Sequence, residues 1–354
     1  MFIWKEKVLQ RCEENLQSYR KKTPHIARAP FKMCAVIKRL KEFFVIAPVD
    51  KAQHNLSIIC KRYYLYILSK ELGSKAYSTI SDCTIQEIMN KHKIFNNKYK
   101  HEHIDNLSYL YWIAKFHKNP PKPRFIAGVS NTYNPTPNAP LPHTLEGRFL
   151  REVHKAKNST TAASTYLSRQ LQIVMKLLQQ KDQQLFEREG YRRCWFIRSV
   201  EEVYLEIKAN QDYLNIKRPR TFDFTTMYTN LEHERIIANV RSTIQEAHKY
   251  IREVLSLNEQ TKYKQLLKDE DTLMDHVVFI VKNTFLCTKG GVLRHQRIGL
   301  LMGTNSAPEL ANLTLYHDES QFIDNFVKQK QIEKAKEHCF NFRLIDDILT
   351  WNGE

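Results

Sequence analysis

Two adjacent acids near the end of the chain, Asp346 and Asp347, are the residues best suited to do chemistry. They lie between two short apolar runs, Phe342–Ile345 and Ile348–Trp351, and this pattern predicts a β-hairpin with both carboxylates at its tip. Because like charges at close range repel, a divalent cation would lower the free energy of such a tip. Alone, an Asp-Asp pair is more often a solvated turn, so metal-dependent phosphoryl chemistry is a hypothesis that other segments must support.

A second acid stands in a segment far upstream, Phe222–Asn230. Here Asp223 leaves a predicted strand, and the aromatic residue Tyr228 follows five positions later. An acid at the end of a strand is otherwise an ordinary exposed residue, and a tyrosine in this place is otherwise an ordinary core residue. Only tertiary folding can bring Asp223 to the predicted hairpin.

A third segment, Gly299–Leu313, reads as a glycine-containing loop that enters a helix. Ser306 is the predicted N-cap, Pro308 falls in the first turn, and Glu309 lies near the positive end of the helix dipole. Gly303 permits a close approach of the backbone to another group.

Composition limits the classes of function. The chain has 354 residues and a net charge of +17, which favours a polyanionic partner, nucleic acid before membrane; a merely basic protein is the alternative. Only 9 glycines are present, and neither a P-loop nor a dinucleotide-binding fingerprint occurs.

The 7 cysteines are dispersed without a Cys/His cluster, which predicts reduced thiols and no zinc site. No apolar run approaches a membrane span and no signal peptide is evident, so we expect an intracellular protein, nuclear or cytoplasmic.

The elements that must position these residues mix strands and helices without strict alternation, which predicts an α+β fold. Residues 1 to about 42 are predicted to be basic and helical. Strands are predicted at 43–48, 57–60, 109–114, 124–128 and 220–225, with a further hairpin around Gly290-Gly291. Helices are predicted at 84–93, from Leu167 to near Gly190, at 233–250 and at 275–281.

Taken in order, the three chemical segments resemble motifs A, B and C of reverse transcriptases. The spellings Asp-Phe-Thr-x-Met-Tyr-Thr-Asn and Arg-x-Ile-Asp-Asp-Ile most resemble Penelope-like retroelement polymerases. Upstream, Lys115–Lys118 and Arg124–Ile126 resemble the finger motifs of that family, and Asp50-Lys51 resembles its N-terminal element. The resemblance spans about residue 45 to the end of the chain.

This resemblance implies the fingers and palm of a right-hand polymerase, with a small antiparallel palm sheet backed by helices. It divides the chain into an N-terminal extension (1–105), a fingers-like region (106–218) and a palm (219–354) that is truncated after motif C, without a thumb. The implied activity is RNA-directed DNA synthesis from dNTPs on an RNA template with a DNA primer. No membrane partner is expected.

The family's metal ligands can be carried over residue by residue. Asp223 and Asp346 match the acids that bridge two Mg²⁺ ions, or Mn²⁺, and Asp347 matches the supporting acid. The backbone carbonyl of Phe224 is a further ligand by resemblance.

The substrate-binding positions follow in the same way. Lys115 and Arg124 match the finger residues that hold the triphosphate, although either base taken singly reads as a solvated surface residue. Tyr228 matches the steric gate against the 2′-hydroxyl of ribonucleotides, and Gly303 lines the nascent base pair.

Two other readings stay open at this stage. An RNA-dependent RNA polymerase shares the same palm chemistry, and Tyr228 argues against it. An inactive or domesticated remnant would bind nucleic acid without catalysis; the intact acids argue against that reading, and the missing thumb argues for it.

Overall fold

The computed structural model describes residue 14 and residues 31–128, 158–210, 219–224, 226–287 and 292–351. Its helices are α2 (Phe31–Phe43), α3 (Lys61–Leu72), α4 (Ile85–Lys98), α6 (Thr161–Glu189), α7 (Val200–Ala209), α8 (Met227–Asn230), α9 (His233–Glu253), α10 (Leu257–Leu266), α11 (Glu270–Lys282), α12 (Ala307–Lys328) and α13 (Ile332–Glu337). Its strands are β1 (Phe44–Val49), β2 (Ala52–Cys60), β3 (Tyr77–Thr79), β4 (Ser108–Lys115), β5 (Lys122–Gly128), β6 (Arg220–Asp223), β7 (Phe285–Cys287), β8 (Leu293–Gln296), β9 (Phe342–Leu344) and β10 (Asp347–Thr350).

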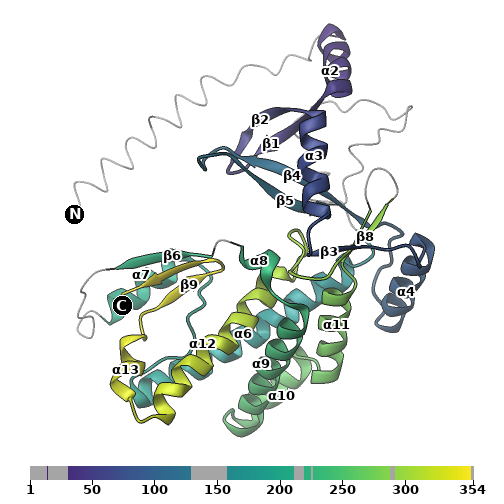
Figure 1. Ribbon diagram of the computed structural model, residues 1–354. Helices are drawn as coiled ribbons and strands as arrows, with labels where there is room; N and C mark the ends of the chain where they lie inside the picture. Colours follow the sequence, from purple (N-terminus) through teal and green to yellow (C-terminus); the bar gives the residue numbers. More distant parts are fainter. Residues whose placement is uncertain are drawn as a thin grey trace.

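The larger sheet has the strand order β2-β1-β4-β7-β8-β3, with β5 paired to β4 off this path. The β1–β4 and β4–β7 contacts are parallel and the other pairs are antiparallel. In Figure 1, β1, β2, β4 and β5 lie beside α3 at the top of the molecule. The register between β4 and β5 pairs Lys115 with Lys122 and Ile113 with Arg124, which brings the two predicted finger bases to one end of the sheet.

The smaller sheet is antiparallel, with the order β6-β10-β9. Leu349 and Trp351 pack against a cluster that includes Val203 of α7, Ile323 of α12 and Ala335 of α13. Helices therefore back this sheet, as the sequence predicted, and the α+β fold class is confirmed.

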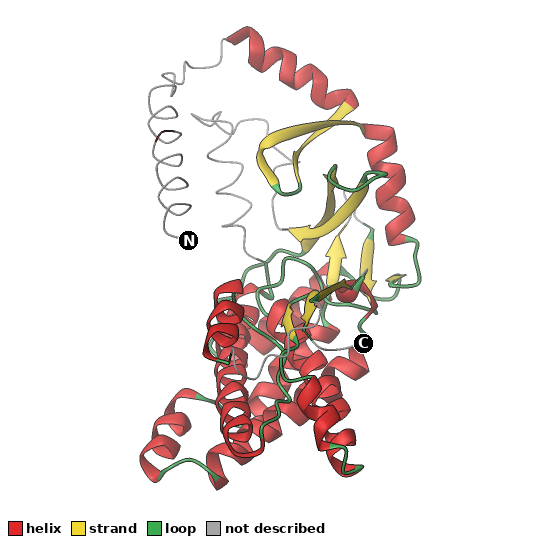
Figure 2. Cartoon of the chain, turned by 90° about the vertical axis from the view of Figure 1, so that its left-hand side faces the viewer, coloured by secondary structure: helices red, strands yellow, loops and turns green. Residues whose placement is uncertain are grey.

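Below the strands, the helices α6, α9, α11 and α12 form the main hydrophobic core (Figure 2). α6 follows the predicted apolar spacing, and its Leu167 and Leu171 are fully buried. It ends at Gly190, whose φ of 77° places it in the left-handed conformation typical of a residue that terminates a helix. Helix α12 also contributes Ile323 to the separate cluster behind the smaller sheet.

Most predicted elements are confirmed, and the differences are local. The helix α3 and the short elements β3, α7, α8, α10 and α13 were not predicted, and β2 begins at Ala52, ahead of the predicted strand at 57–60. Strand β6 ends at Asp223, two residues earlier than predicted. Most of the predicted N-terminal helix and the Gly290-Gly291 turn lie outside the described residues; α2 covers the end of the former, and β7 and β8 are paired on either side of the latter.

The hairpin that carries Asp346 and Asp347 turns one position earlier than predicted. β9 ends at Leu344 and β10 begins at Asp347, so the turn residues are Ile345 and Asp346. Ile345 takes a φ of 59°, and this left-handed residue reverses the chain where no glycine is available.

Strands from all three regions inferred from the sequence belong to one sheet. β1 and β2 of the first region pair with β4 of the second, and β7 and β8 of the third join the same sheet. The domain boundaries therefore stay a prediction.

None of the described helices combines the length and the apolar character needed to traverse a bilayer.

Candidate functional site

The β6–β10 ladder brings the predicted acids together. Asp347 pairs directly with Asp223, so their side chains leave the same face of the sheet from Cα atoms about 4.5–5.5 Å apart. The amide of Phe224 donates to the carbonyl of Asp346 at 3.1 Å, which fixes the turn against the end of β6. Four predicted ligand positions thus lie within one small part of the sheet.

The side chains themselves are not gathered into a ready-made metal site. Within the described ranges, no group of three or more His, Cys, Asp or Glu side chains is arranged to hold a metal ion. Mutual repulsion of carboxylates favours rotamers that point apart, whereas the backbone register alone sets how close they can come. The donor set of carboxylates and one carbonyl fits Mg²⁺ or Mn²⁺, which prefer oxygen ligands.

Lys115 and Arg124 approach these acids from the larger sheet. Burial and the neighbouring Arg124 charge lower the pKa of Lys115, while the charges of Asp50 and Asp346 act in the opposite direction. Asp346 in the hairpin and Lys115 in β4 are therefore close enough to interact electrostatically.

Arg124 is held by a buried acid. Its Nη1 donates to Oδ1 of Asp50 at 2.7 Å, and the Asp50 side chain is only 6% exposed. The amide of Asp50 in turn donates to the carbonyl of Ala114 at 3.1 Å, next to Lys115. The Asp50-Lys51 element, matched from sequence without a role, thus orients one of the two predicted triphosphate-binding bases.

Tyr228 lies in α8, between the acids and the glycine loop. Burial, followed by the charge of Asp346, raises its pKa to about 12, so the phenol is neutral at physiological pH. Its backbone carbonyl accepts a hydrogen bond from Leu300 at 2.6 Å. At Gly299, with a φ of 91°, a Cβ would come within 2.5 Å of that same carbonyl, so glycine allows the loop to pack on α8.

Gly303 also permits a close approach, but to the chain's own strand. Its φ is 111°, and a Cβ would lie 2.3 Å from the carbonyl oxygen of Ala127 in β5. Ala127 donates its amide to Met302 at 2.8 Å, which completes the contact. The glycine loop is thereby held against β5 of the larger sheet.

The predicted cap of α12 differs in detail. Ser306 occupies the N-cap position, but its hydroxyl makes no cap hydrogen bond and instead lies 3.1 Å from the hydroxyl of Ser164 in α6. Its φ and ψ of −90° and 0° are not the extended values that aim a capping side chain at the helix. Pro308 and Glu309 lie in the first turn as predicted.

Arg343, the arginine of the Arg-x-Ile-Asp-Asp-Ile segment, was given no role from the sequence; it lies two residues before the turn and is fully buried. A basic residue in a short strand normally indicates a solvated face, so its burial was not predicted.

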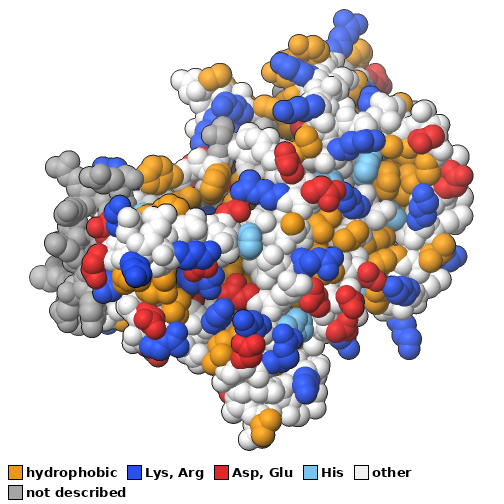
Figure 3. Space-filling model, turned by 60° about the horizontal axis from the view of Figure 1, so that its bottom comes forward, with side chains coloured by type: hydrophobic (Ala, Val, Ile, Leu, Met, Phe, Trp, Pro, Cys, Tyr) orange, Lys and Arg blue, Asp and Glu red, His pale blue; other side chains and the backbone are white. Residues whose placement is uncertain are grey.

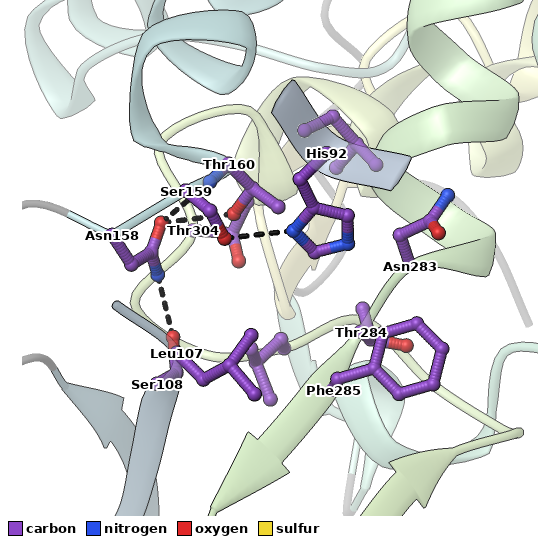
Figure 4. Close-up of a pocket in the computed structure, with 12 residues that line it drawn as sticks. His92, Leu107, Ser108, Asn158, Ser159, Thr160, Asn283, Thr284, Phe285 and Thr304 are labelled. Carbon is purple, nitrogen blue, oxygen red and sulfur yellow. Dashed lines mark hydrogen bonds between the residues drawn. The ribbon is translucent and has the colours of Figure 1, made fainter. Parts of the chain in front are cut away.

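A small cavity lies behind the glycine loop (Figure 4). His92 Nδ1 and the Ser159 hydroxyl are 2.7 Å apart in its wall, and Asn158 donates to Ser108 at 2.5 Å. Leu301 and Thr304 of the loop complete the lining. At about 10 Å³ the cavity holds on the order of one water molecule, so it supports the loop and cannot hold a nucleotide.

The helical face of the molecule shows no single basic surface. In Figure 3, Lys and Arg side chains are interspersed with Asp and Glu over the described part of this face. The net charge of +17 is therefore not concentrated on this face. We do not expect a polyanion to bind here.

Comparison with solved structures identifies the fold. Telomerase from Candida albicans, in complex with a fragment of telomeric RNA, is 15% identical with a TM-score of 0.51, over 89% of this chain and 46% of that one. Telomerase from Candida tropicalis, truncated from its C-terminal domain, is 14% identical with a TM-score of 0.51, over 89% of this chain and 53% of the other.

The chain has a reverse-transcriptase-like fold. It spans about half the length of the telomerases that it matches. No protein-family model matches the sequence, and no curated protein matches it.

Proposed function

We propose that this chain carries the fingers and palm of an RNA-directed DNA polymerase, of the Penelope-like retroelement type that its motifs resemble. The observation that carries the proposal is the direct pairing of Asp223 with Asp347 in a hairpin sheet whose Asp346 interacts electrostatically with Lys115. Acids opposite bases, in a fold like that of telomerase, are the arrangement that nucleotidyl transfer requires. RNA template, DNA primer and dNTPs are the proposed partners.

Asp223, Asp346 and the carbonyl of Phe224 would hold two divalent cations, with Asp347 as the supporting acid. When bound, such cations favour ionisation of the primer 3′-hydroxyl and neutralise charge on the leaving pyrophosphate. Lys115 supplies a point charge to the triphosphate, and Arg124 supplies the guanidinium donors that Asp50 leaves free. In this proposal the neutral ring of Tyr228 excludes the 2′-hydroxyl of a ribonucleotide by its bulk.

Primer extension on an RNA template with Mg²⁺ tests the proposal. The double variant Asp346→Ala with Asp347→Ala should abolish incorporation of dNTPs. The matched control, Asp82→Ala with Asp271→Ala, removes two exposed acids elsewhere and should leave extension unchanged. Extension that survives loss of the hairpin acids would overturn the assignment.

The competing proposal, a remnant that binds nucleic acid without catalysis, gives a different result. A filter-binding assay with an RNA–DNA heteroduplex would then show binding, while no incorporation would occur with Mg²⁺ or Mn²⁺.

A further inference from the structure

Arg343 is among the largest fully buried side chains in the described part of the chain, and it lies directly behind the acidic turn. A buried guanidinium is strongly unfavourable unless every donor finds a partner. The location and the partners of Arg343 therefore need an explanation beyond packing.

Most of its partners belong to α12, the helix that follows the glycine loop. Nε donates to Oε1 of Glu319, and Nη2 donates to Oε2 of the same carboxylate at 3.1 Å. Nη1 donates to Oδ1 of Asn312 at 2.7 Å, and Nη2 to the Asn312 carbonyl at 3.2 Å. This bidentate fork fixes the guanidinium on α12.

One further hydrogen bond reaches the turn itself. Nη1 of Arg343 donates to the carbonyl of Ile345 at 3.2 Å. Ile345 is the β-branched residue with a φ of 59°, a conformation that costs free energy for such a side chain and persists only when its surroundings impose it. Asp346 is the next residue along the chain.

The backbone of Arg343 is held as firmly as its side chain. Its amide donates to Trp195 at 2.6 Å, and its carbonyl accepts from Ile197 at 2.9 Å. Across the hairpin it pairs with Ile348 of β10. With its main chain anchored on one side and its guanidinium on α12, Arg343 can transmit the position of that helix to the turn.

We propose that Arg343 is a positioning residue for the candidate active site. By holding the carbonyl of Ile345, it keeps the turn in the left-handed conformation that orients Asp346. Because its guanidinium is fixed on α12, the orientation of Asp346 depends on the position of that helix. The inference rests on the proposed function, because it assigns Arg343 a role in the metal site of that function. A residue with a merely structural role would stabilise the fold without setting metal affinity.

The test separates metal affinity from folding by measuring Mn²⁺ binding through electron paramagnetic resonance titration, beside thermal unfolding. Arg343→Lys keeps the charge but loses the planar fork, so the turn should relax and Mn²⁺ affinity should fall by about 10-fold or more. Arg193→Lys is the matched control, since Arg193 is also a mostly buried arginine that pairs with two acids, Glu246 and Asp324, on α9 and α12. It should lower the unfolding temperature similarly and leave Mn²⁺ affinity unchanged.

A second variant decides the mechanism. Glycine adopts a positive φ without a Cβ penalty, so adding Ile345→Gly to Arg343→Lys should restore most of the lost Mn²⁺ affinity. The inference is overturned if Arg343→Lys binds Mn²⁺ as the wild type does, or if Ile345→Gly restores nothing. If Arg343→Lys does not fold, Glu319→Gln replaces it, because this change weakens the fork that fixes the guanidinium on α12. Mn²⁺ affinity equal to that of the wild type in Glu319→Gln would then overturn the inference. Absence of Mn²⁺ binding by the wild type would instead count against the proposed function.

Discussion

Asp223 and Asp347 are directly opposed in the antiparallel ladder between β6 and β10, although they belong to segments far apart in the sequence. Both residues are exposed, so their charges repel through solvent and the repulsion is on the order of 1 kcal/mol or less. Such a pairing slightly destabilises the sheet unless a cation lies between the carboxylates.

The first prediction concerns stability with and without metal. Asp223→Asn should leave the unfolding temperature unchanged or slightly higher in EDTA, because it removes the repulsion with Asp347. Mn²⁺ at 100 times its Kd should stabilise the wild type by about 2.7 kcal/mol and the variant by much less. Differential scanning fluorimetry measures both, with the exposed acid Asp82→Asn as the control. An equal Mn²⁺ response in Asp223→Asn and the wild type would contradict the metal site.

The second prediction concerns the glycine loop. Gly303→Ala would place a Cβ 2.3 Å from the Ala127 carbonyl at a φ of 111°, so β5 or the loop must shift. We expect Gly303→Ala to lower the free energy of unfolding by about 1–3 kcal/mol. It should also lower the rate of primer extension more than the control variant does. Gly73→Ala is the control, since Gly73 has a φ of −87° that alanine adopts freely. Denaturant unfolding that shows the two variants equally stable would contradict the argument.

The elements of the fold followed from local patterns, because each pattern reflects burial on one face. The spacing of Leu167 and Leu171 predicted α6, and Gly190 predicted its end; both are confirmed. α3 was missed because its outward face carries Tyr63, Leu65 and Tyr66, which are 55%, 45% and 63% exposed and blur the apolar periodicity.

The candidate site was only partly predictable. The acids and bases were recognisable by their types and order, but the register that opposes Asp223 to Asp347 is a tertiary property. Arg343 belonged to the recognised Arg-x-Ile-Asp-Asp-Ile segment, but its role was not predicted, because nothing in a sequence tells a buried arginine from a solvated one. The left-handed Ile345 was missed for a similar reason: local rules assign such a conformation to glycine or asparagine, and only the surrounding contacts impose it on isoleucine.

The third prediction concerns pH. Since burial and Arg124 lower the pKa of Lys115, this lysine loses its proton at a lower pH than an ordinary lysine. Triphosphate binding needs the charged form, so the KM for dNTPs should rise as pH increases through that lowered pKa. Lys115→Arg should flatten this alkaline limb, because arginine stays charged.

Asp50→Asn tests the direction in which the Asp50 charge shifts the pKa of Lys115. The Asp50 charge raises the pKa of Lys115, so its removal should move the alkaline limb of KM to lower pH. Asp275→Asn is the control, because Asp275 forms a 2.7 Å pair with Lys98 at an exposed position. A shift to higher pH in Asp50→Asn, or an equal shift in both variants, would contradict the assignment of Lys115.

The last prediction concerns the sugar of the incoming nucleotide. Tyr228 packs its backbone on the glycine loop, through Leu300, and its ring is half-buried beside Asp346. If the ring excludes a 2′-hydroxyl by its bulk, Tyr228→Ala should raise incorporation of ribonucleotides relative to dNTPs by about 10-fold or more.

Tyr228→Phe keeps the ring and should keep the discrimination, which separates bulk from the phenolic hydroxyl. The measurement is the ratio of kcat/KM for matched rNTP and dNTP pairs on one RNA template. A wild type that already prefers ribonucleotides would favour the RNA polymerase alternative. An unchanged ratio in Tyr228→Ala would remove Tyr228 from sugar selection and leave its ring a packing role against the main hydrophobic core.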